Sequence, residues 1–496
     1  MANEGIIAID LGAESGRVVL GALKYGTLWT EEVHRFTHRP VPTPAGLCWD
    51  LTGLWNNILE GLRRAVTTAE REKIEPKSVG VDTWGVDWTI VSPVDTIRGL
   101  PRAYRCAAFP GSFEKVLGKV PAEKIYEATG IQLMAINTLY QYALGVELEP
   151  ERFEGGRLAF MPDLLHWLLS GKVTNERTIA STSQMLDART GDWATELLQT
   201  LRLPQAPLSK PIAPGTRIGS VTKAVSTAIG CQTELSVIAP PSHDTAAAVA
   251  AVPADSGSTW AYLSSGTWSL LGAELDAPII TPESAAANFT NELGVNNTVR
   301  FLKNIAGLWL VQETRRALEK RGQSYDYPHL VRLAEREKPF RTLIAANHPN
   351  FIAPGNMIEA IQEYAKQTEQ PIPMSAGELV RCCMESLALE YRRSLHTLQR
   401  LLGKEFDVLH IVGGGSKNAL LNQMAADATG LPVCTGPSEA TAMGNLLVQA
   451  MGLGLVKDLA ELRAIVRRTA EPQTIRPNNP ADWDAVAERY EALPQK

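Results

Sequence analysis

Two apolar runs separated by a short polar turn open the chain, in "GIIAIDLGAESGRVVLG" at residues 5–21. The continuation "RVVLGALKYGTLWTEEVHRF" is rich in Val, Leu and aromatic residues around the turn "KYG", which predicts two further strands rather than a helix. The turn glycines, Gly12 and Gly16, are spaced GxxxG, so this turn carries neither the GxGxxG of a dinucleotide fold nor the GxxxxGK[ST] of a P-loop. The pattern predicts a β-hairpin whose turn offers backbone N–H groups to a phosphate.

The same hairpin pattern recurs in "TWAYLSSGTWSLLGAEL" at residues 259–275. Placing Gly12 on Gly266 puts Ser264 at the position of Asp10 and Thr267 at the position of Ala13. Two such turns in separate halves of the chain indicate duplicated domains that face each other across one nucleotide. Hydroxyl groups of the second turn can donate to phosphate oxygens directly.

The first turn differs from the second because it carries Asp10. A carboxylate beside a phosphate is repulsive unless a cation lies between them, so Asp10 predicts Mg²⁺, partly through water. The alternative is that Asp10 accepts hydrogen bonds from the amides of its own turn, as Asp commonly does. The second hairpin favours the metal.

Between the hairpins the spacing of apolar residues changes. In "WDLTGLWNNILEGLRRAVTTAEREK" one helical face collects Leu54, Ile58, Leu62 and Ala65, with Thr52 placed to cap, and residues 78–91 return to strand character. Three strands, a helix and a strand form the core of the actin-like, sugar-kinase nucleotide fold. The Pro- and Gly-bearing stretch 251–258 predicts a boundary between domains 1–250 and 251–496.

The second half of the chain is predicted to be rich in helices, and it holds one strand–glycine turn–helix unit. We expect long helices in "NIAGLWLVQETRRALEKRG", "SAGELVRCCMESLALEYRRSLHTLQRLLG" and "NALLNQMAADATG". In "FDVLHIVGGGSKNALLNQ" the turn glycines 413–415 let the backbone approach a flat or phosphorylated ligand closely. The turn is therefore interpreted as a third wall of the nucleotide site.

The length, net charge and cysteine spacing of the chain exclude several classes of protein. The 496 residues require two or more domains, and the net charge of −6 argues against a nucleic-acid or anionic-membrane partner. The opening lacks the pattern of a signal peptide, and no apolar run approaches the ~18 residues of a membrane span. The six cysteines show no CxxC spacing, which predicts reduced, mostly buried thiols and a cytoplasmic protein. The sequence is compatible with a monomer.

The polar group "SHDT" interrupts the apolar stretch "VIAPPSHDTAAAVAAVP" just before the predicted boundary. We expect Asp244 to start an Ala-rich helix that keeps its carboxylate ionised, with His243 and Thr245 beside it. Phosphoryl transfer needs alignment, a metal and a base for the accepting hydroxyl, and Asp244 is the candidate base. A Ser–His–Asp hydrolase is excluded because adjacent residues cannot converge as such a triad.

Two further polar groups are candidates for ligand contacts. "DTWGVDW" combines acids with aromatics around Gly85, which suits a sugar. "FLKNIAGLWLVQE" places Asn304 and Gln312 on either side of an apolar helical segment, where one amide could reach the acceptor and the other the nucleotide.

Taken together, these stretches resemble the FGGY carbohydrate kinases, and most closely the branch that acts on L-rhamnulose. The resemblance runs in order over nearly the whole chain, through "DLGAESGRV", "EVHRF", "DTWGVDW", "GLPRAYR", "GIQLMAINTLYQ", "MPDLL", "SHDTA", "YLSSGTWSLLG", "LKNIAGLWLVQ", "LHIVGGG", "LLNQMAADATG" and "GPSEATAMGN". It implies an α/β, two-domain actin-like (ribonuclease H-like) fold that closes on ATP and a ketose. The implied reaction is the Mg²⁺-dependent transfer of phosphate from ATP to the 1-hydroxyl of L-rhamnulose.

The resemblance also implies roles for individual residues. Asp244 is the implied proton acceptor, and Asp10 remains the candidate metal ligand. The implied sugar contacts are Gly85, His243, Asp244, Thr245 and Asn304. The implied ATP contacts are Ala13, Glu14, Ser15, Gly16, Arg17, Thr267, Gln312 and Gly414, with residues 436–445 toward the adenosine.

Two positions depart from the family pattern. Glu14 stands where similar kinases often carry a small hydroxyl residue, and Cys106 stands where the L-rhamnulose branch commonly has Asp. Two alternatives therefore stay open: a kinase of another ketose such as L-fuculose, and a non-catalytic actin-like sugar sensor. Retention of both Asp10 and Asp244 argues against the sensor.

Overall fold

The structure is a computed structural model that describes residues 3–255, 257–352 and 355–495. Ser256 of the predicted boundary lies outside the described residues, as do Met1 and Ala2. The chain forms two compact units: unit 1 comprises Met1–Ala251, Glu274–Phe301 and Ala440–Ala470, and unit 2 comprises Val252–Ala273, Leu302–Glu439 and Glu471–Lys496. The division into domains 1–250 and 251–496 stays a prediction, whereas each compact unit combines three separate segments of the chain.

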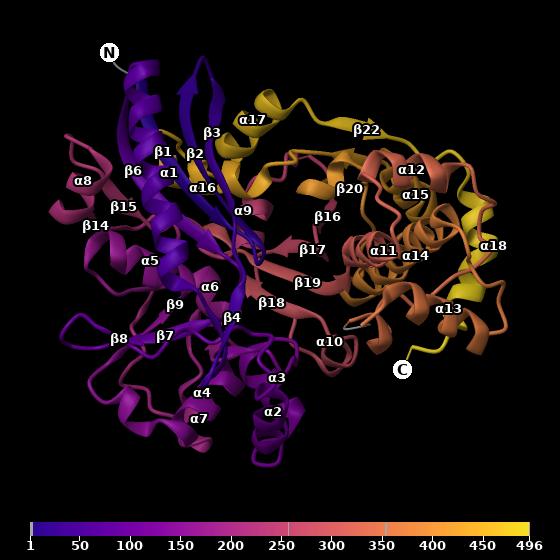
Figure 1. The fold of residues 1–496 in the computed structure, drawn as a ribbon, viewed down its shortest axis with the longest axis horizontal. Coiled ribbons are helices and arrows are strands. Elements are labelled where there is room, and N and C mark those ends of the chain that lie inside the picture. Colours follow the sequence, from indigo (N-terminus) through magenta and orange to yellow (C-terminus); the bar gives the residue numbers. More distant parts are fainter. Residues whose placement is uncertain (1–2, 256, 353–354, 496) are drawn as a thin grey trace. The chain divides into compact units, whose positions relative to one another are not determined.

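Unit 1 is built on a six-stranded sheet with the order β14-β15-β6-β1-β2-β3 (Figure 1). Its strands are β1 (Asn3–Leu11), β2 (Ser15–Lys24), β3 (Thr27–Thr37), β6 (Ile74–Thr83), β14 (Arg217–Ser220) and β15 (Ser236–Ile238). Strands β1, β2 and β3 are consecutive antiparallel neighbours, which confirms the predicted hairpin and third strand. Strands β1, β6 and β15 run parallel, so their carboxyl ends lie at one edge of the sheet.

Helix α1 (Leu51–Glu72) packs on one face of this sheet. Strand alternation puts Ile7, Ile9 and Leu11 of β1 in the same core cluster as the buried apolar face of α1, which confirms the predicted face. The expectation that Thr52 caps the helix is wrong. Asp50 is the last non-helical residue, and its carboxylate accepts the Gly53 N–H at 2.9 Å.

Helix α16 (Ala440–Gly452) comes from late in the chain and packs against β1, β6 and α9 (Asp244–Ala250) of unit 1. The approach is close because Gly444 has no side chain, and a Cβ added there would overlap the backbone carbonyl of Ala247 in α9. Gln449 donates to the carbonyl of Ile7 at 3.0 Å and accepts from Ser78 at 2.8 Å. These bonds satisfy polar groups inside an apolar core.

Residues 78–91 do not form one continuous strand, in contrast to the prediction. Strand β6 ends at Thr83, and β7 (Trp88–Val91) belongs to another sheet with the order β8-β7-β9. The chain turns between them through Val86, whose φ of 70° is unusual for a β-branched residue. This turn separates the two strands.

The remaining elements of unit 1 surround these sheets. The short strands are β4 (Pro40–Thr43), β5 (Gly46–Trp49), β8 (Ile97–Arg98), β9 (Arg157–Phe160), β10 (Asn175–Glu176), β11 (Leu186–Asp187), β12 (Asp192–Trp193), β13 (Pro211–Ile212) and β18 (Thr290–Leu293). The helices are α2 (Phe109–Leu117), α3 (Ala122–Thr129), α4 (Thr138–Leu148), α5 (Met161–Ser170), α6 (Arg177–Ser181), α7 (Thr195–Thr200), α8 (Lys223–Ile229), α10 (Pro282–Ala286) and α17 (Leu459–Ala470).

The second large sheet has the order β18-β19-β17-β16-β20-β21-β22, and most of its length belongs to unit 2. Its strands after β18 are β16 (Trp260–Ser265), β17 (Trp268–Leu275), β19 (Val299–Ala306), β20 (Val408–Val412), β21 (Val433–Thr435) and β22 (Gln473–Ile475). Strands β16 and β17 are antiparallel, which confirms the second predicted hairpin, and β20 runs parallel to β16.

The helices of unit 2 largely follow the sequence pattern. They are α11 (Trp309–Lys320), α12 (Tyr327–Glu335), α13 (Met357–Gln367), α14 (Ala376–Leu402), α15 (Ala419–Thr429) and α18 (Pro480–Glu491). The prediction is wrong at the start of α11, because Asn304 lies on β19 and the helix begins only at Trp309. Gly307 makes the corner possible, since a Cβ there would lie 2.6 Å from the backbone of Trp268.

The six cysteines are buried, and none of them forms a disulfide. Over the described ranges, no helix is both long and apolar enough to cross a membrane.

Candidate active site

Asp10 and Asp82 lie at the carboxyl ends of neighbouring parallel strands in unit 1, and Asp244 starts the helix that follows β15. Asp10 of β1 and Asp82 of β6 are register partners, and Thr83 forms a parallel bridge with His243, the residue before Asp244. Burial raises the pKa of Asp82 well above its ordinary value, and the charges of Asp10 and Asp244 raise it further. The sheet thus brings together the predicted metal ligand and the predicted base.

Asp10 already has a cationic partner. Arg17, its register partner on β2, donates to Asp10 Oδ2 through Nε at 2.8 Å and through Nη2 at 2.6 Å. The predicted ATP turn Ala13–Arg17 is closed by a bond from the Gly12 N–H to the Ser15 carbonyl at 2.9 Å, and Glu14 is exposed. The carboxylate of Asp10 therefore fixes the arginine next to this turn.

Carboxylate oxygens at this edge of the sheet are suitable ligands for Mg²⁺. Both Arg17 contacts go to one oxygen of Asp10, and Asp82 Oδ1 is buried without a hydrogen-bond partner, while Asn445 donates to Asp82 Oδ2 at 2.6 Å. No group of three or more His, Cys, Asp or Glu suited to a metal occurs in the described part of the chain. One or two carboxylate oxygens suit a Mg²⁺ ion that takes its other ligands from phosphate and water.

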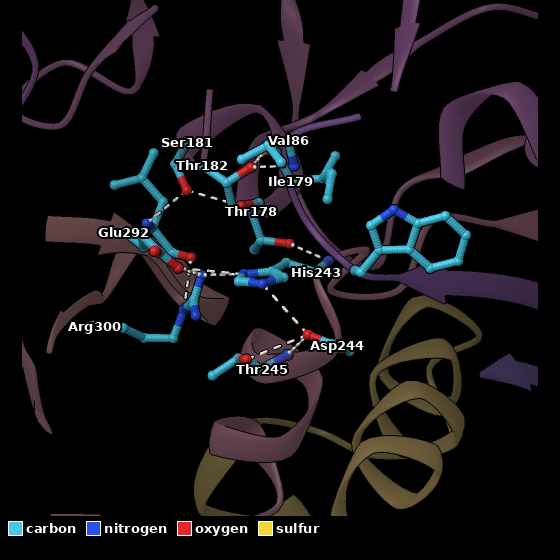
Figure 2. A network of polar contacts seen from close by, with 12 residues as sticks. Val86, Thr178, Ile179, Ser181, Thr182, His243, Asp244, Thr245, Glu292 and Arg300 are labelled. Atoms are coloured by element: carbon cyan, nitrogen blue, oxygen red, sulfur yellow. Dashed lines mark hydrogen bonds and ion pairs between the residues drawn. The ribbon is translucent and has the colours of Figure 1, made fainter. Parts of the chain in front are cut away.

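Asp244 is the first residue of α9, and three donors meet on one of its oxygens. Oδ1 accepts from the Thr245 N–H at 2.6 Å and from Thr245 Oγ1 at 3.2 Å, and His243 Nε2 lies 3.3 Å away (Figure 2). The side chain keeps 30% exposure, so Oδ2 is available to a ligand. Burial raises the pKa of Asp244 against the effect of His243, and the expectation that the helix start keeps this carboxylate ionised stays a prediction.

The far side of His243 contacts a buried ion pair. Its Nδ1 lies 3.2 Å from Glu292 Oε2 and 3.3 Å from Arg300 Nη2, and the two partners are 3.1 Å apart (Figure 2). Burial opposes ionisation of Glu292, but Arg300 and His243 outweigh it and lower its pKa. The side chains of His243 and Asp244 therefore belong to a chain of four polar groups.

The backbone before α9 is held by a second set of contacts. Glu176 accepts the Ser242 N–H at 3.1 Å, and the His243 N–H donates to Thr178 Oγ1 at 3.2 Å. Thr178 Oγ1 in turn donates to Glu176 at 2.6 Å. These bonds fix the path of the chain that presents Asp244.

The turn around Gly85 is tightly fixed. The Val86 N–H donates to Thr182 Oγ1 at 3.2 Å, and the Val86 carbonyl accepts from Thr138 at 2.7 Å. A Cβ on Gly85 would lie 3.2 Å from the same Thr182 hydroxyl. Strained backbone such as that of Val86 is common where a ligand binds, and this fits the predicted sugar contact at Gly85.

Both carboxyl oxygens of Asp87 in "DTWGVDW" accept hydrogen bonds. Oδ2 accepts from Trp49 Nε1 at 2.6 Å, Trp84 Nε1 at 3.0 Å and the Tyr104 N–H at 3.2 Å, and Oδ1 accepts from Gln141 at 3.2 Å. The carboxylate thereby organises the aromatic residues beside the turn. Cys106, a departure from the family pattern, is buried with Phe109 and Leu144.

Unit 2 brings together three of the four predicted contacts that it contains. The Trp309 N–H donates to the Thr267 carbonyl at 3.1 Å, which ties the second hairpin turn to the helix that carries Gln312. The side-chain oxygen of Gln312 is buried without a hydrogen-bond partner. Gly414 starts the turn after β20, next to Gly415, which packs on Ser265 at the end of β16. Asn304 lies on β19.

Sequence reasoning missed Glu176, Glu292, Arg300 and Asn445 as parts of the site. Arg300 carries a signal, since it is a single charge inside the apolar run "VRFL" and a buried charge requires a partner. Nothing in the local pattern around Glu292 distinguishes it from a surface residue. Asn445 lies in a stretch expected near the adenosine, and the structure buries it against Asp82.

Comparisons with known proteins agree with this architecture. Rhamnulokinase from Bacteroides thetaiotaomicron is 41% identical over 485 residues, covering 98% of both chains, and rhamnulokinase from Bacillus subtilis is 37% identical, covering 95% of each. Gluconate kinase from Lactobacillus acidophilus has a similar fold, with a TM-score of 0.80 at 15% identity over 98% of this chain and 97% of that chain. Glycerol kinase from Plasmodium falciparum, solved with ADP, gives a TM-score of 0.76 at 13% identity over 98% of each chain.

Two family descriptions cover most of the sequence. The N-terminal domain of the FGGY family of carbohydrate kinases matches residues 5–250, and the C-terminal domain of the same family matches residues 261–453. The actin-like sugar-kinase fold expected from the strand and helix order is thereby confirmed. The chain belongs to the FGGY family of carbohydrate kinases.

Proposed function

We propose that this carbohydrate kinase transfers the terminal phosphate of ATP to the 1-hydroxyl of L-rhamnulose, giving L-rhamnulose 1-phosphate and ADP. The sugar is proposed because the rhamnulokinases it resembles match over nearly the full length of both chains. The chemistry rests on one observation, the carboxylate of Asp244, which has one oxygen held by neighbouring donors and the other available. The proposed setting is the cytoplasm and L-rhamnose catabolism.

In this proposal Asp244 Oδ2 takes the proton of the sugar hydroxyl as the oxygen attacks phosphorus. A pKa raised by burial suits this role, because a base accepts a proton most effectively when its pKa approaches the working pH. His243 and Thr245 hold the other oxygen and thereby fix the direction of the base. Gly85, His243, Thr245 and Asn304 are the proposed sugar contacts.

Each unit by itself contains proposed ATP contacts. In unit 1 they are the turn residues Ala13, Glu14, Ser15, Gly16 and Arg17, and in unit 2 they are Thr267, Gln312 and Gly414. The buried, unpartnered oxygen of Gln312 supports a role as acceptor from the nucleotide. Asp10 is the proposed ligand of Mg²⁺, which supplies positive charge against the phosphates.

A coupled ADP-release assay over L-rhamnulose, L-fuculose and other ketoses tests the proposal. We expect L-rhamnulose to be preferred, and Asp244→Asn to lower kcat by roughly 10²–10⁴-fold, the range for loss of a general base. The matched control is Asp50→Asn, the same change at the start of α1, where Asn caps as well as Asp. We expect the control to keep wild-type activity within about twofold.

Three results would contradict the proposal. A preference for L-fuculose would show that the substrate assignment is wrong. Full turnover by Asp244→Asn would show that Asp244 is not the base. No ADP release with any ketose would favour a sugar sensor.

A further inference from the structure

The chain Asp244–His243–Glu292–Arg300 links the proposed base to a charge pair in the interior of unit 1 (Figure 2). The four side chains come from three places: the start of α9, strand β18 and strand β19. Glu292 and Arg300 lie in the segment Glu274–Phe301, which joins unit 1 from the second half of the sequence. Their contacts with the site are therefore formed by tertiary folding.

This pair is well buried. Arg300 is fully buried and Glu292 is 6% exposed. Arg300 Nε donates to the Leu293 carbonyl at 3.1 Å, and its Nη2 lies 3.1 Å from Glu292. A buried ion pair contributes little stability over an apolar pair of the same volume, so stability alone explains it poorly.

The side chain that both charges contact is His243. Its backbone N–H is held by Thr178, and its Nδ1 lies between Glu292 and Arg300. Arg300 Nη2 can only donate, so its contact favours the form of the ring in which Nδ1 accepts and Nε2 carries the proton. With Nδ1 turned to Arg300, the geometry of the ring directs the Nε2–H to Asp244 Oδ1.

We propose that Arg300 and Glu292 form a positioning pair, in which Glu292 holds Arg300 and Arg300 fixes the ring of His243 and through it the direction of the Asp244 carboxylate. The inference rests on the proposed function, in which Asp244 is the base and His243 contacts the sugar. Glu292 and Arg300 touch neither substrate in this proposal. Their effect passes through the imidazole.

Kinetics of Glu292→Gln test the proposal. The change keeps the volume of the side chain and removes its charge, so Arg300 loses its anionic partner and the ring loses its fixed orientation. We expect kcat/KM for L-rhamnulose to fall roughly 10- to 100-fold, the range known for groups that orient a functional histidine, while KM for ATP stays within about twofold. The Asp replacement, Glu292→Asp, keeps the charge and is expected to restore part of the loss.

The matched control is Glu385→Gln in α14 of unit 2. Glu385 is 1% exposed and pairs with Arg381 at 2.7 Å, so the control also removes the charge of a buried Glu–Arg pair. A merely structural role of Glu292 predicts the same kinetics for both variants, with any change confined to the thermal unfolding temperature. Equal kcat/KM values for the two variants would overturn the proposal.

A spectroscopic measurement on the unmodified protein tests, independently of activity, which nitrogen of His243 carries the proton. In ¹⁵N-histidine NMR, with the signal of His243 assigned from His243→Asn, we expect a proton on Nε2 and none on Nδ1. A proton on Nδ1 would overturn the proposal, including in the event that Glu292→Gln does not fold. Lack of L-rhamnulose turnover by the wild type, with the proton on Nε2, would refute the proposed substrate and leave the positioning of His243 intact.

Discussion

Replacement of Asp87 by Asn is expected to change how the stability of the protein depends on pH. Asp87 is almost fully buried, and burial raises its pKa from the ordinary 3.8 to about 7, although Trp49, Trp84, Gln141 and Tyr104 donate to it and oppose the rise. The folded protein therefore holds a proton on this carboxyl over a pH range in which the unfolded chain has lost it.

The size of the effect follows from the two pKa values. A difference of about three pKa units corresponds to about 4 kcal/mol. Because the folded pKa is the higher one, this contribution to stability is complete below about pH 4 and is lost as the pH rises through about 7. Asn has no proton to release, so Asp87→Asn lacks the dependence. Between pH 4 and 8 the free energy of unfolding of the variant should rise relative to wild type by about 4 kcal/mol.

Two measurements check the reasoning. Urea unfolding of both proteins at several pH values gives the difference in stability. Tryptophan fluorescence gives the titration directly, since two indole N–H groups donate to this carboxylate and their emission should change with its charge. Subtracting the variant's pH curve removes the contribution of the other tryptophans, and we expect a midpoint near pH 7.

Identical pH profiles for the two proteins would refute this reasoning. That result would mean that the four N–H donors stabilise the carboxylate as well as water does, and that burial does not control its pKa.

Three further changes test other parts of the structure. Gly444→Ala should lower the thermal unfolding temperature by about 1–3 °C, because the new methyl overlaps the Ala247 carbonyl. Overpacking costs roughly 1–3 kcal/mol against ~1 kcal/mol of helix propensity gained, and an unchanged temperature contradicts the close packing. Asp10→Asn should raise the Mg²⁺ concentration for half-maximal activity roughly tenfold, and equal Mg²⁺ dependence in both proteins would remove Asp10 from the metal site. Gly415→Ala should raise KM for ATP about tenfold or more by displacing the turn from Ser265, and a KM increase for the ketose alone would contradict the nucleotide role.

The parts of the fold that sequence predicted are those determined by local pattern. Both hairpins were predictable because alternating apolar residues flank a glycine turn, and α1 because its apolar residues recur with helical spacing. Asp244 stood out because a polar group interrupts an apolar segment. The placement of Asn304 failed because "NIA" continues a strand, and only the corner at Gly307 ends it.

The rest depended on contacts between distant residues. Glu292 meets His243 only after β18 has joined unit 1, and Asn445 meets Asp82 only after α16 has packed on β6. The rise in the pKa of Asp244 likewise comes from burial by the folded chain, which the helix start alone did not predict. These partners are distant in the sequence, so the local spacing of residues does not predict them.

Unit 1 is assembled from segments that are far apart in the sequence, and this affects its folding during synthesis. Strands β1 and β6 leave the ribosome early, but α16 and α17 follow only when Ala440–Ala470 has been synthesised. At translation rates of roughly 5–20 residues per second, the sheet waits roughly 10–40 s after residue 250 for these helices. During that time Gly80 lacks the cover of Gln449, and Gly21 lacks the cover of Leu446. A nascent chain halted before Ala440 should therefore depend on chaperones.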